Sequence, residues 1–200
     1  MTAPLPPDAV RIRSTALARL RLYASRCPFE IGGLGQVLAD ADGLLITKLF
    51  ILPQRVSMSD TELESAGLFD LLARLVAEGE DVRTLRLWWH SHAEMEVSWS
   101  ETDLATIDNL PGEFWVAIVT NRHGDLRCRL DRFAPTRETW ELPLLEVADD
   151  SEVAEELFEA DIDSEILAQV QSPLPLQDLL GSYGAPPKEP ETFHAHGRTE

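Results

Sequence analysis

Two histidines and an aspartate stand at a spacing that suits a metal ion. His90 and His92 lie two positions apart in a stretch that predicts a β-strand, and Asp103 lies in the helix expected next. Alternate residues of a strand point to the same side, so both imidazoles can reach one ion. With a carboxylate from the first helical turn, three ligands leave a fourth zinc position for water, whose pKa then falls toward about 7. The pattern predicts a zinc-dependent hydrolase.

Each part of this pattern also has a purely structural interpretation. A His-x-His pair alone is usually coincidental. Ser100 and Asp103 form the pattern of a capping box, in which serine caps the helix and the carboxylate accepts a hydrogen bond from the serine backbone amide. Ser100 can cap the helix and still offer its hydroxyl near the metal. For Asp103 the two roles compete, because we expect a ligating carboxylate to be pulled away from the cap.

The complete string, His-Ser-His, seven residues, Ser100, two residues and Asp103, resembles the motif of the JAMM/MPN+ (JAB domain) zinc metalloproteases. That family also carries a glutamate on an earlier strand followed by glycines, which Glu30 and the segment 31–35 match. The resemblance covers about residues 10–135. Ala93 departs from it, since many members have proline there; we expect this to change the stiffness of the loop rather than the chemistry.

The resemblance implies a role for each of five residues. His90, His92 and Asp103 would bind Zn²⁺. Glu30 would accept a proton from the metal-bound water and pass it to the leaving amine, as a general acid–base. Ser100 would donate a hydrogen bond to the developing oxyanion.

The family also implies a substrate class. Most members cleave amide bonds at the C-terminus of ubiquitin-like proteins, so we expect an isopeptidase or peptidase acting on a ubiquitin-like or sulfur-carrier-like protein. Its extended tail would bind as an added strand near residues 53–64. The short connection after Asp103 lacks the second insertion of eukaryotic deubiquitinases, which favours a prokaryotic type. Trp99, beside Ser100, is expected in the core or on the wall of the substrate groove.

Two alternatives remain at this point. The first is a JAMM-type peptidase acting on another substrate, such as a cell-wall peptide or a small conjugate. The second is a non-catalytic MPN binding module within an assembly. The sequence names neither the substrate and linkage nor the oligomeric state.

The elements that position these residues predict an α+β fold with α/β/α layers, a mixed and mostly antiparallel sheet flanked by helices; the resemblance implies the MPN/JAB domain. In the strand expected over 82–92, alternation places Leu85, Leu87 and Trp89 on one face and Trp88, His90 and His92 on the other. The polar residues 53–64 predict a loop. The expected elements are a strand and helix over 9–26, strands over 30–38 and 44–52, a helix over 65–79, a helix over 100–110, strands over 113–120 and 126–133, and a short strand within 140–147.

The pattern changes near residue 148. We predict a domain over 1–147, an acidic amphipathic helix over 148–171 and a disordered tail over 172–200. The helix either packs permanently on the domain or is a removable element that binds a protein partner or inhibits the enzyme. In the tail, His194 and His196 repeat the His-x-His spacing, and we expect them to be solvated. The apolar positions within 149–170 are Val153, Leu157, Ile162, Ile166, Leu167 and Val170.

Charge and composition exclude several classes of partner. The formal net charge is −18, most of it in residues 138–200, and such a field repels nucleic-acid backbones and anionic membranes. The sequence contains no run of about 18 apolar residues, so we expect no membrane span. There is no secretory signal pattern, and we expect Cys27 and Cys128 to be reduced thiols. We therefore expect a cytoplasmic protein without nucleic-acid or membrane partners.

Overall fold

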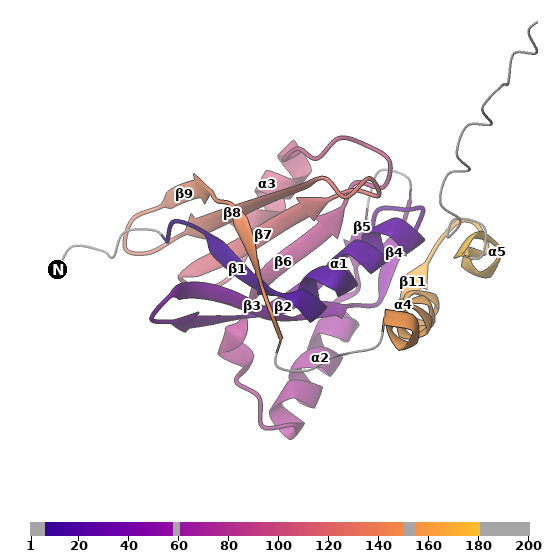
Figure 1. Cartoon of the computed structure of the whole chain (residues 1–200), viewed down its shortest axis with the longest axis horizontal. Coiled ribbons are helices and arrows are strands. Elements are labelled where there is room, and N and C mark those ends of the chain that lie inside the picture. Colours follow the sequence, from indigo (N-terminus) through magenta and orange to yellow (C-terminus); the bar gives the residue numbers. More distant parts are fainter. Residues whose placement is uncertain (1–6, 58–60, 150–154, 181–200) are drawn as a thin grey trace, which may run out of the picture.

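The computed structural model describes residues 7–57, 61–149 and 155–180, and these form an α+β fold (Figure 1). No helix in this part of the chain combines the length and apolar character that crossing a membrane requires. The elements in chain order are β1 (Val10–Arg13), α1 (Ser14–Arg26), β2 (Gly32–Asp40), β3 (Gly43–Ile51), β4 (Gln54–Val56), β5 (Thr61–Leu63), α2 (Ser65–Ala77), the short 3₁₀ helix η1 (Val82–Thr84), β6 (Leu85–Ser91), α3 (Glu101–Asp108), β7 (Phe114–Thr120), β8 (Leu126–Arg132), β9 (Glu138–Glu141), β10 (Leu144–Val147), α4 (Glu155–Gln169), β11 (Val170–Gln171) and α5 (Leu176–Leu180).

A mixed sheet of eight strands forms the centre of the fold, in the order β10-β1-β3-β2-β6-β7-β8-β9, and a smaller sheet has the order β11-β4-β5. In the large sheet the pairs β2–β3, β2–β6, β7–β8 and β8–β9 are antiparallel, and β1–β10, β1–β3 and β6–β7 are parallel. β6, which carries His90, therefore lies in the middle of the sheet with a partner on each side.

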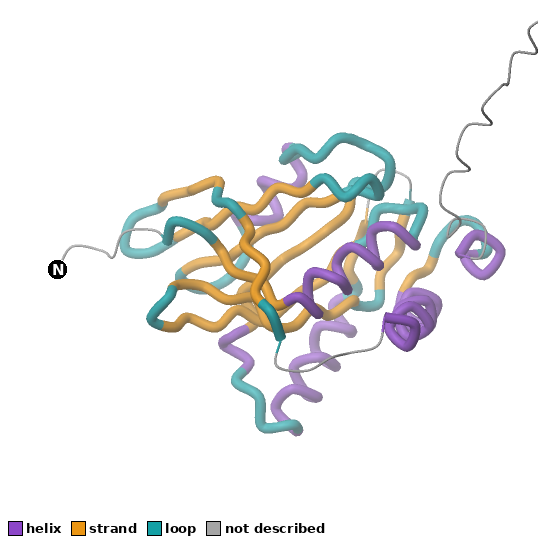
Figure 2. Tube along the Cα trace, in the orientation of Figure 1, coloured by secondary structure: helices purple, strands orange, loops and turns teal. Residues whose placement is uncertain are grey.

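The large sheet curls because its two edges are joined by a very short link. β9 ends at Glu141 and β10 begins at Leu144, although these strands form opposite edges. The intervening backbone spans at most roughly 11 Å when fully extended, so the edges must approach one another. Hydrogen bonds of 3.0 Å fix the link, one from Leu142 N to Cys128 O and one from Val10 N to Pro143 O. Figure 2 shows the resulting strand layer, with helices on both of its faces.

The buried side chains form two clusters, one on each face of the sheet. The predicted division of the neighbouring tryptophans is confirmed, since Trp89 lies in the first cluster and Trp88 in the second. Leu85 was expected beside Trp89 but lies with Trp88. Gly35 pairs with Leu87 and Gln36 with Leu85, so Arg86 is an extra residue on β6 that breaks the alternation there. The first cluster includes Val10, Ile12, Leu20, Tyr23, Leu87, Val116, Ile118, Cys128 and Leu130, and the second includes Leu34, Leu71, Leu75, Ile107, Trp115 and Ala117.

The loop predicted over 53–64 is partly wrong, because it contains β4 and β5. β4 pairs with β5, the next strand, and with β11, which lies more than a hundred residues later. No local pattern could reveal the pairing with β11. Gln54 explains the polar composition: it is fully buried, and its side-chain amide bonds both the N–H and the carbonyl oxygen of Gly32 at 2.9 Å. Residues 58–60 lie outside the described part of the chain.

The C-terminal segment packs on the domain through apolar contacts and ion pairs. Ile162 and Ile166 of α4 are buried in the first cluster, whereas Leu167 is 46% exposed. Two ion pairs join α4 to α1, Arg19 with Glu165 and Arg26 with Asp163. Of the other predicted apolar positions, Val170 is buried in β11, and the side chains of Val153 and Leu157 lie outside the description.

The prediction of a disordered tail is wrong for residues 176–180. They form α5, and its residues Leu176 and Leu180 are buried in the first cluster, which the polar composition around them conceals. Residues 181–200, with His194 and His196, lie outside the described chain. The core thus continues beyond residue 148.

Replacing Ile166 with alanine should lower the free energy of unfolding by about 2–5 kcal/mol, because it leaves a cavity in the first cluster. Leu167→Ala, one position away on the exposed side, should change it by no more than about 0.5 kcal/mol. Chemical denaturation of both variants measures the difference. For the same reason the fragment 1–147 should aggregate or melt far below the full chain; a fragment that melts like the full chain would show that the helix is removable.

Candidate metal centre

His90, His92 and Asp103, predicted as ligands, converge in the structure. The Nε2 atoms of the two histidines are 3.1 Å apart. His90 Nε2 lies 3.1 Å from Oδ1 of Asp103, and His92 Nε2 lies 3.5 Å from Oδ2. All three residues are buried, and among the described residues this group is the one that could hold a metal ion.

The strand pairing of β6 fixes the position of His90. His90 is paired with Gly32 of β2 and with Val119 of β7. A Cβ at position 32 would lie 2.9 Å from the carbonyl oxygen of Trp89 and 3.3 Å from Cβ of His90, so glycine permits this close approach. Ser91, between the two histidines, is buried, and its Oγ accepts a hydrogen bond of 3.2 Å from the backbone N–H of Ile31.

Asp103 belongs to the helix cap and also lies in the cluster with the two histidines. Its Oδ2 accepts a hydrogen bond of 2.8 Å from Ser100 N, and its own N–H donates to Ser100 Oγ at 3.1 Å, which completes the capping box. Its Oδ1 meanwhile faces His90. The cap uses Oδ2 for its short contact and leaves Oδ1 directed at His90, because a carboxylate has two oxygens. That metal binding pulls the carboxylate from the cap stays a prediction.

Hydrogen bonding and burial set the charge of each ligand. His92 Nδ1 lies 3.0 Å from the carbonyl oxygen of Glu96, so Nδ1 must carry a proton. When the ring is neutral, the lone pair of Nε2 therefore faces the cluster. His90 is stacked on Trp88 at 4.5 Å, and its buried Nδ1 has no partner within the described chain. Burial lowers the pKa of His90, which favours the neutral ring that a metal needs.

The carboxylate of Asp103 is ionised. Burial alone would raise the pKa of Asp103, but hydrogen bonds from His90 and His92 outweigh burial and hold the pKa far below its usual range. The hydrogen bond with Asp103 raises the pKa of His92 in turn, against the effect of its own burial, and the nearby charge of Glu30 adds to this rise. The donor set thus consists of two imidazole nitrogens and one anionic oxygen.

These donors fit zinc in their chemistry and in their spacing. Two ligand atoms at about 2.0–2.1 Å from a tetrahedral zinc lie about 3.3 Å from one another. Here His90 Nε2 lies 3.1 Å from His92 Nε2 and 3.1 Å from Oδ1 of Asp103, while His92 Nε2 lies 3.5 Å from the other carboxylate oxygen, Oδ2. Two histidines and one carboxylate are also a usual ligand set for catalytic zinc, in which the fourth position stays open.

A cavity of about 460 Å³ opens onto the three side chains, and Glu30 and Ser100 form part of its wall. The structure therefore brings all five predicted site residues around one cavity. A larger cavity of about 750 Å³ lies between α1, α2 and β3 and has none of the five in its wall. We place the site at the smaller cavity, because it contains the group of converging ligand atoms.

Glu30 is held against the site by the segment around it. Its backbone N–H donates to Ser57 O at 3.2 Å, while Phe29 and Ile31, on either side, are buried in the first cluster. Its side chain is only 7% exposed. Flanked by two anchored residues, Glu30 has little freedom to leave the cavity wall.

The segment after His92 follows a course that proline could not adopt. Ala93 has a φ of 45°, whereas the ring of proline fixes φ near −65°. Ala93 is also buried, and its carbonyl oxygen accepts a hydrogen bond of 2.9 Å from Arg122 N. The backbone course at this position is therefore incompatible with proline.

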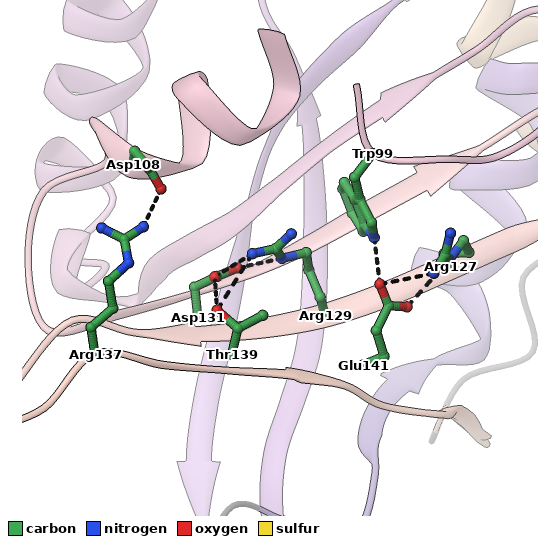
Figure 3. A network of polar contacts seen from close by, with 8 residues as sticks. All are labelled: Trp99, Asp108, Arg127, Arg129, Asp131, Arg137, Thr139 and Glu141. Carbon is green, nitrogen blue, oxygen red and sulfur yellow. Dashed lines mark hydrogen bonds and ion pairs between the residues drawn. The ribbon is translucent and has the colours of Figure 1, made fainter. Parts of the chain in front are cut away.

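Trp99 lies behind the site and not on the cavity wall. Its indole Nε1 donates to Glu141 Oε1 at 2.7 Å, toward the edge of the sheet (Figure 3). Glu141 and its neighbours Arg127 and Arg129 on β8 were not among the predicted site residues. The alternation of charged and apolar residues in 127–131 is the signal that could have revealed a polar face there.

Comparison with solved structures supports the fold and goes no further. The chain is similar to the solution structure of protein DSY2949 from Desulfitobacterium hafniense, with a TM-score of 0.51 and 12% sequence identity. The alignment covers 70% of this chain and 94% of that chain. No protein-family model matches the chain, and the search of curated proteins found no match.

We predict one Zn²⁺ per chain, and loss of that zinc in His92→Ala, because two remaining ligands bind zinc weakly. Metal analysis of the purified proteins measures both. The double variant His90→Ala/His92→Ala, made in a chain that ends at residue 180, removes any contribution of His194 and His196. Stoichiometric zinc in that variant would show that the ion binds elsewhere.

Replacing Ala93 with proline should destabilise the protein by more than about 1 kcal/mol, because the native φ is incompatible with the ring. Ala93→Gly should keep both stability and zinc, since glycine adopts positive φ without strain. Thermal melting and zinc content of the two variants test this pair of expectations. A proline variant with unchanged melting temperature and zinc content would mean that the segment does not need this backbone course.

Proposed function

We propose that the protein is a zinc metallopeptidase of the JAMM/MPN+ type, with an MPN/JAB domain, that hydrolyses amide or isopeptide bonds. One observation carries the proposal. The residues whose spacing resembles the family motif form a buried three-ligand cluster, and Glu30 and Ser100 lie on the wall of the cavity beside it. Two ligands and a helix cap could arise by chance, but the convergence of five residues from three separate segments is much harder to explain without a catalytic role.

A zinc ion held by His90, His92 and Asp103 would supply Lewis-acid polarisation of the substrate carbonyl and a water of lowered pKa. Glu30 is placed to take the proton of the attacking water and to return it to the leaving amine. Its burial next to the imidazole of His92 restricts both steps to the cavity.

Ser100 is placed to stabilise the negative charge on the substrate oxygen. Its Oγ accepts the hydrogen bond from Asp103 N with a lone pair, which leaves the hydroxyl proton available for another acceptor. Since the same serine caps α3, its hydroxyl is oriented before the substrate binds. A preorganised donor is worth more in the transition state than one that must first be ordered.

We further propose that the substrate is a ubiquitin-like or sulfur-carrier-like protein. β5 is an edge strand of the small sheet, and its first residue, Thr61, lies on the wall of the cavity. An extended C-terminal tail can add to such an edge through backbone hydrogen bonds, with its last peptide bond directed to the metal. A peptidase for another substrate would use the same five residues, whereas a non-catalytic module would have no need of a buried carboxylate at Glu30.

Substituting Glu30 with glutamine should keep zinc and lower turnover by at least about 10²-fold, the usual scale of general acid–base catalysis. Cleavage of a panel of ubiquitin-like fusion proteins measures turnover, and metal analysis measures zinc. Glu101→Gln is the matched control, because Glu101 is an exposed glutamate in the first turn of α3. Loss of zinc in Glu30→Gln, or a rate close to that of the unsubstituted protein, would contradict the assigned role.

A further inference from the structure

The segment between His92 and Ser100 carries a site residue at each end and contains no helix or strand. Such a segment needs specific contacts to keep both ends in place. Its first part has them: Met95 N donates to His92 O at 2.8 Å, and Asn121 Nδ2 donates to Met95 O at 3.0 Å. Its last part depends on one large side chain, Trp99.

Trp99 contacts three different groups. Its Nε1 donates to Glu141 Oε1 at 2.7 Å. The guanidinium carbon of Arg129 lies 5.3 Å from the centre of the indole, a cation–π distance. The ring of His90 lies at 6.2 Å and is tilted by 57°. The indole thus connects the edge strands of the sheet with a metal ligand.

The groups that hold Trp99 are themselves fixed by charged neighbours (Figure 3). Arg127 donates to the carboxylate of Glu141 at 3.1 and 3.3 Å. Asp131 accepts two hydrogen bonds from Arg129, at 2.7 and 2.6 Å, and a third of 2.6 Å from Thr139. Strand alternation on β8 directs the three charged side chains to the same face, while Cys128 and Leu130 between them point into the core.

Burying the ion pair of Arg129 and Asp131 costs desolvation free energy. Asp131 is 1% exposed and Arg129 is 8% exposed. A buried ion pair often contributes no more stability than apolar residues of similar volume would, so stability alone is a weak explanation for it. Its geometry suggests another: the bidentate contact fixes the plane of the guanidinium, and the guanidinium supports the indole.

We propose that Trp99 is a positioning residue for the metal centre, held in place by Arg129 and Glu141. Trp99 directly precedes Ser100, whose backbone N–H bonds Oδ2 of Asp103. A shift of the indole therefore moves the start of α3 and the carboxylate of Asp103 relative to His90. The role rests on the proposed zinc site and extends it to β8 and β9, at the far edge of the sheet.

The test compares the Zn²⁺ affinity of variants, by competition with a chelator, with the melting temperatures of the same proteins without metal. Glu141→Ala and Trp99→Phe both lose the indole hydrogen bond and should bind Zn²⁺ about tenfold more weakly, within the usual effect of groups that orient ligands. Glu141→Gln keeps an oxygen acceptor and should remain close to the unsubstituted protein. Glu138→Ala is the matched control. Glu138 lies on β9, as Glu141 does, and its substitution removes an ion pair with Arg132 of β8 and no contact with Trp99.

Unchanged Zn²⁺ affinity in both Glu141→Ala and Trp99→Phe would overturn the role. An equal loss of affinity in Glu141→Gln, or a loss that only parallels a fall in melting temperature across all four variants, would also overturn it, because that result indicates general stability. Failure of the unsubstituted protein to bind Zn²⁺ would contradict the proposed function itself and is distinguishable from these outcomes.

Discussion

The carboxylate of Asp103 links the local structure of the site to its chemistry. One oxygen bonds the backbone of Ser100 and starts α3, and the other faces His90. Because the group is both a helix cap and a member of the ligand cluster, α3 can begin only where the cluster requires it. The hydrogen bond from the backbone N–H of Ser100 lowers the pKa of Asp103 further, in addition to the hydrogen bonds with the two histidines.

The curled sheet provides the other half of the site. β6 lies between β2 and β7, so backbone pairing on both sides fixes the positions from which its side chains project. Gly32 lets β2 approach His90 closely, and the chain just before β2 carries Glu30. Glu30 and His90 are therefore positioned by the same pair of strands, although the chain separates them by sixty residues.

Local patterns predicted the parts of this structure that local interactions determine. The helices over 14–26 and 65–77 and the strand that carries His90 have clear apolar periodicity, and each was predicted within a few residues of its observed bounds. β4, β11 and α5 were missed, because their pairing and burial depend on contacts between the middle and the end of the chain. The side on which Leu85 packs depends on a register shift in the pairing of β2 with β6, which strict alternation along β6 does not anticipate.

The candidate site was predicted more completely than the fold for a physical reason. Four of its five residues lie within fourteen positions of one another, at the end of one strand and at the start of the next helix, so their spacing already limits where they can meet. Glu30 required the resemblance to a known family, since a single glutamate at a strand end has no distinctive pattern. Trp99 was placed incorrectly on the groove wall as one option, because its direction is determined by Arg129 and Glu141 on distant strands.

Diffraction at the zinc absorption edge, from crystals grown with one equivalent of Zn²⁺, tests the central claim most directly. We expect one anomalous peak within coordinating distance of His90 Nε2, His92 Nε2 and Oδ1 of Asp103, with Oδ2 still bonded to the backbone of Ser100. A peak at any other position, the absence of a peak, or an Asp103 carboxylate rotated out of the helix cap would contradict it.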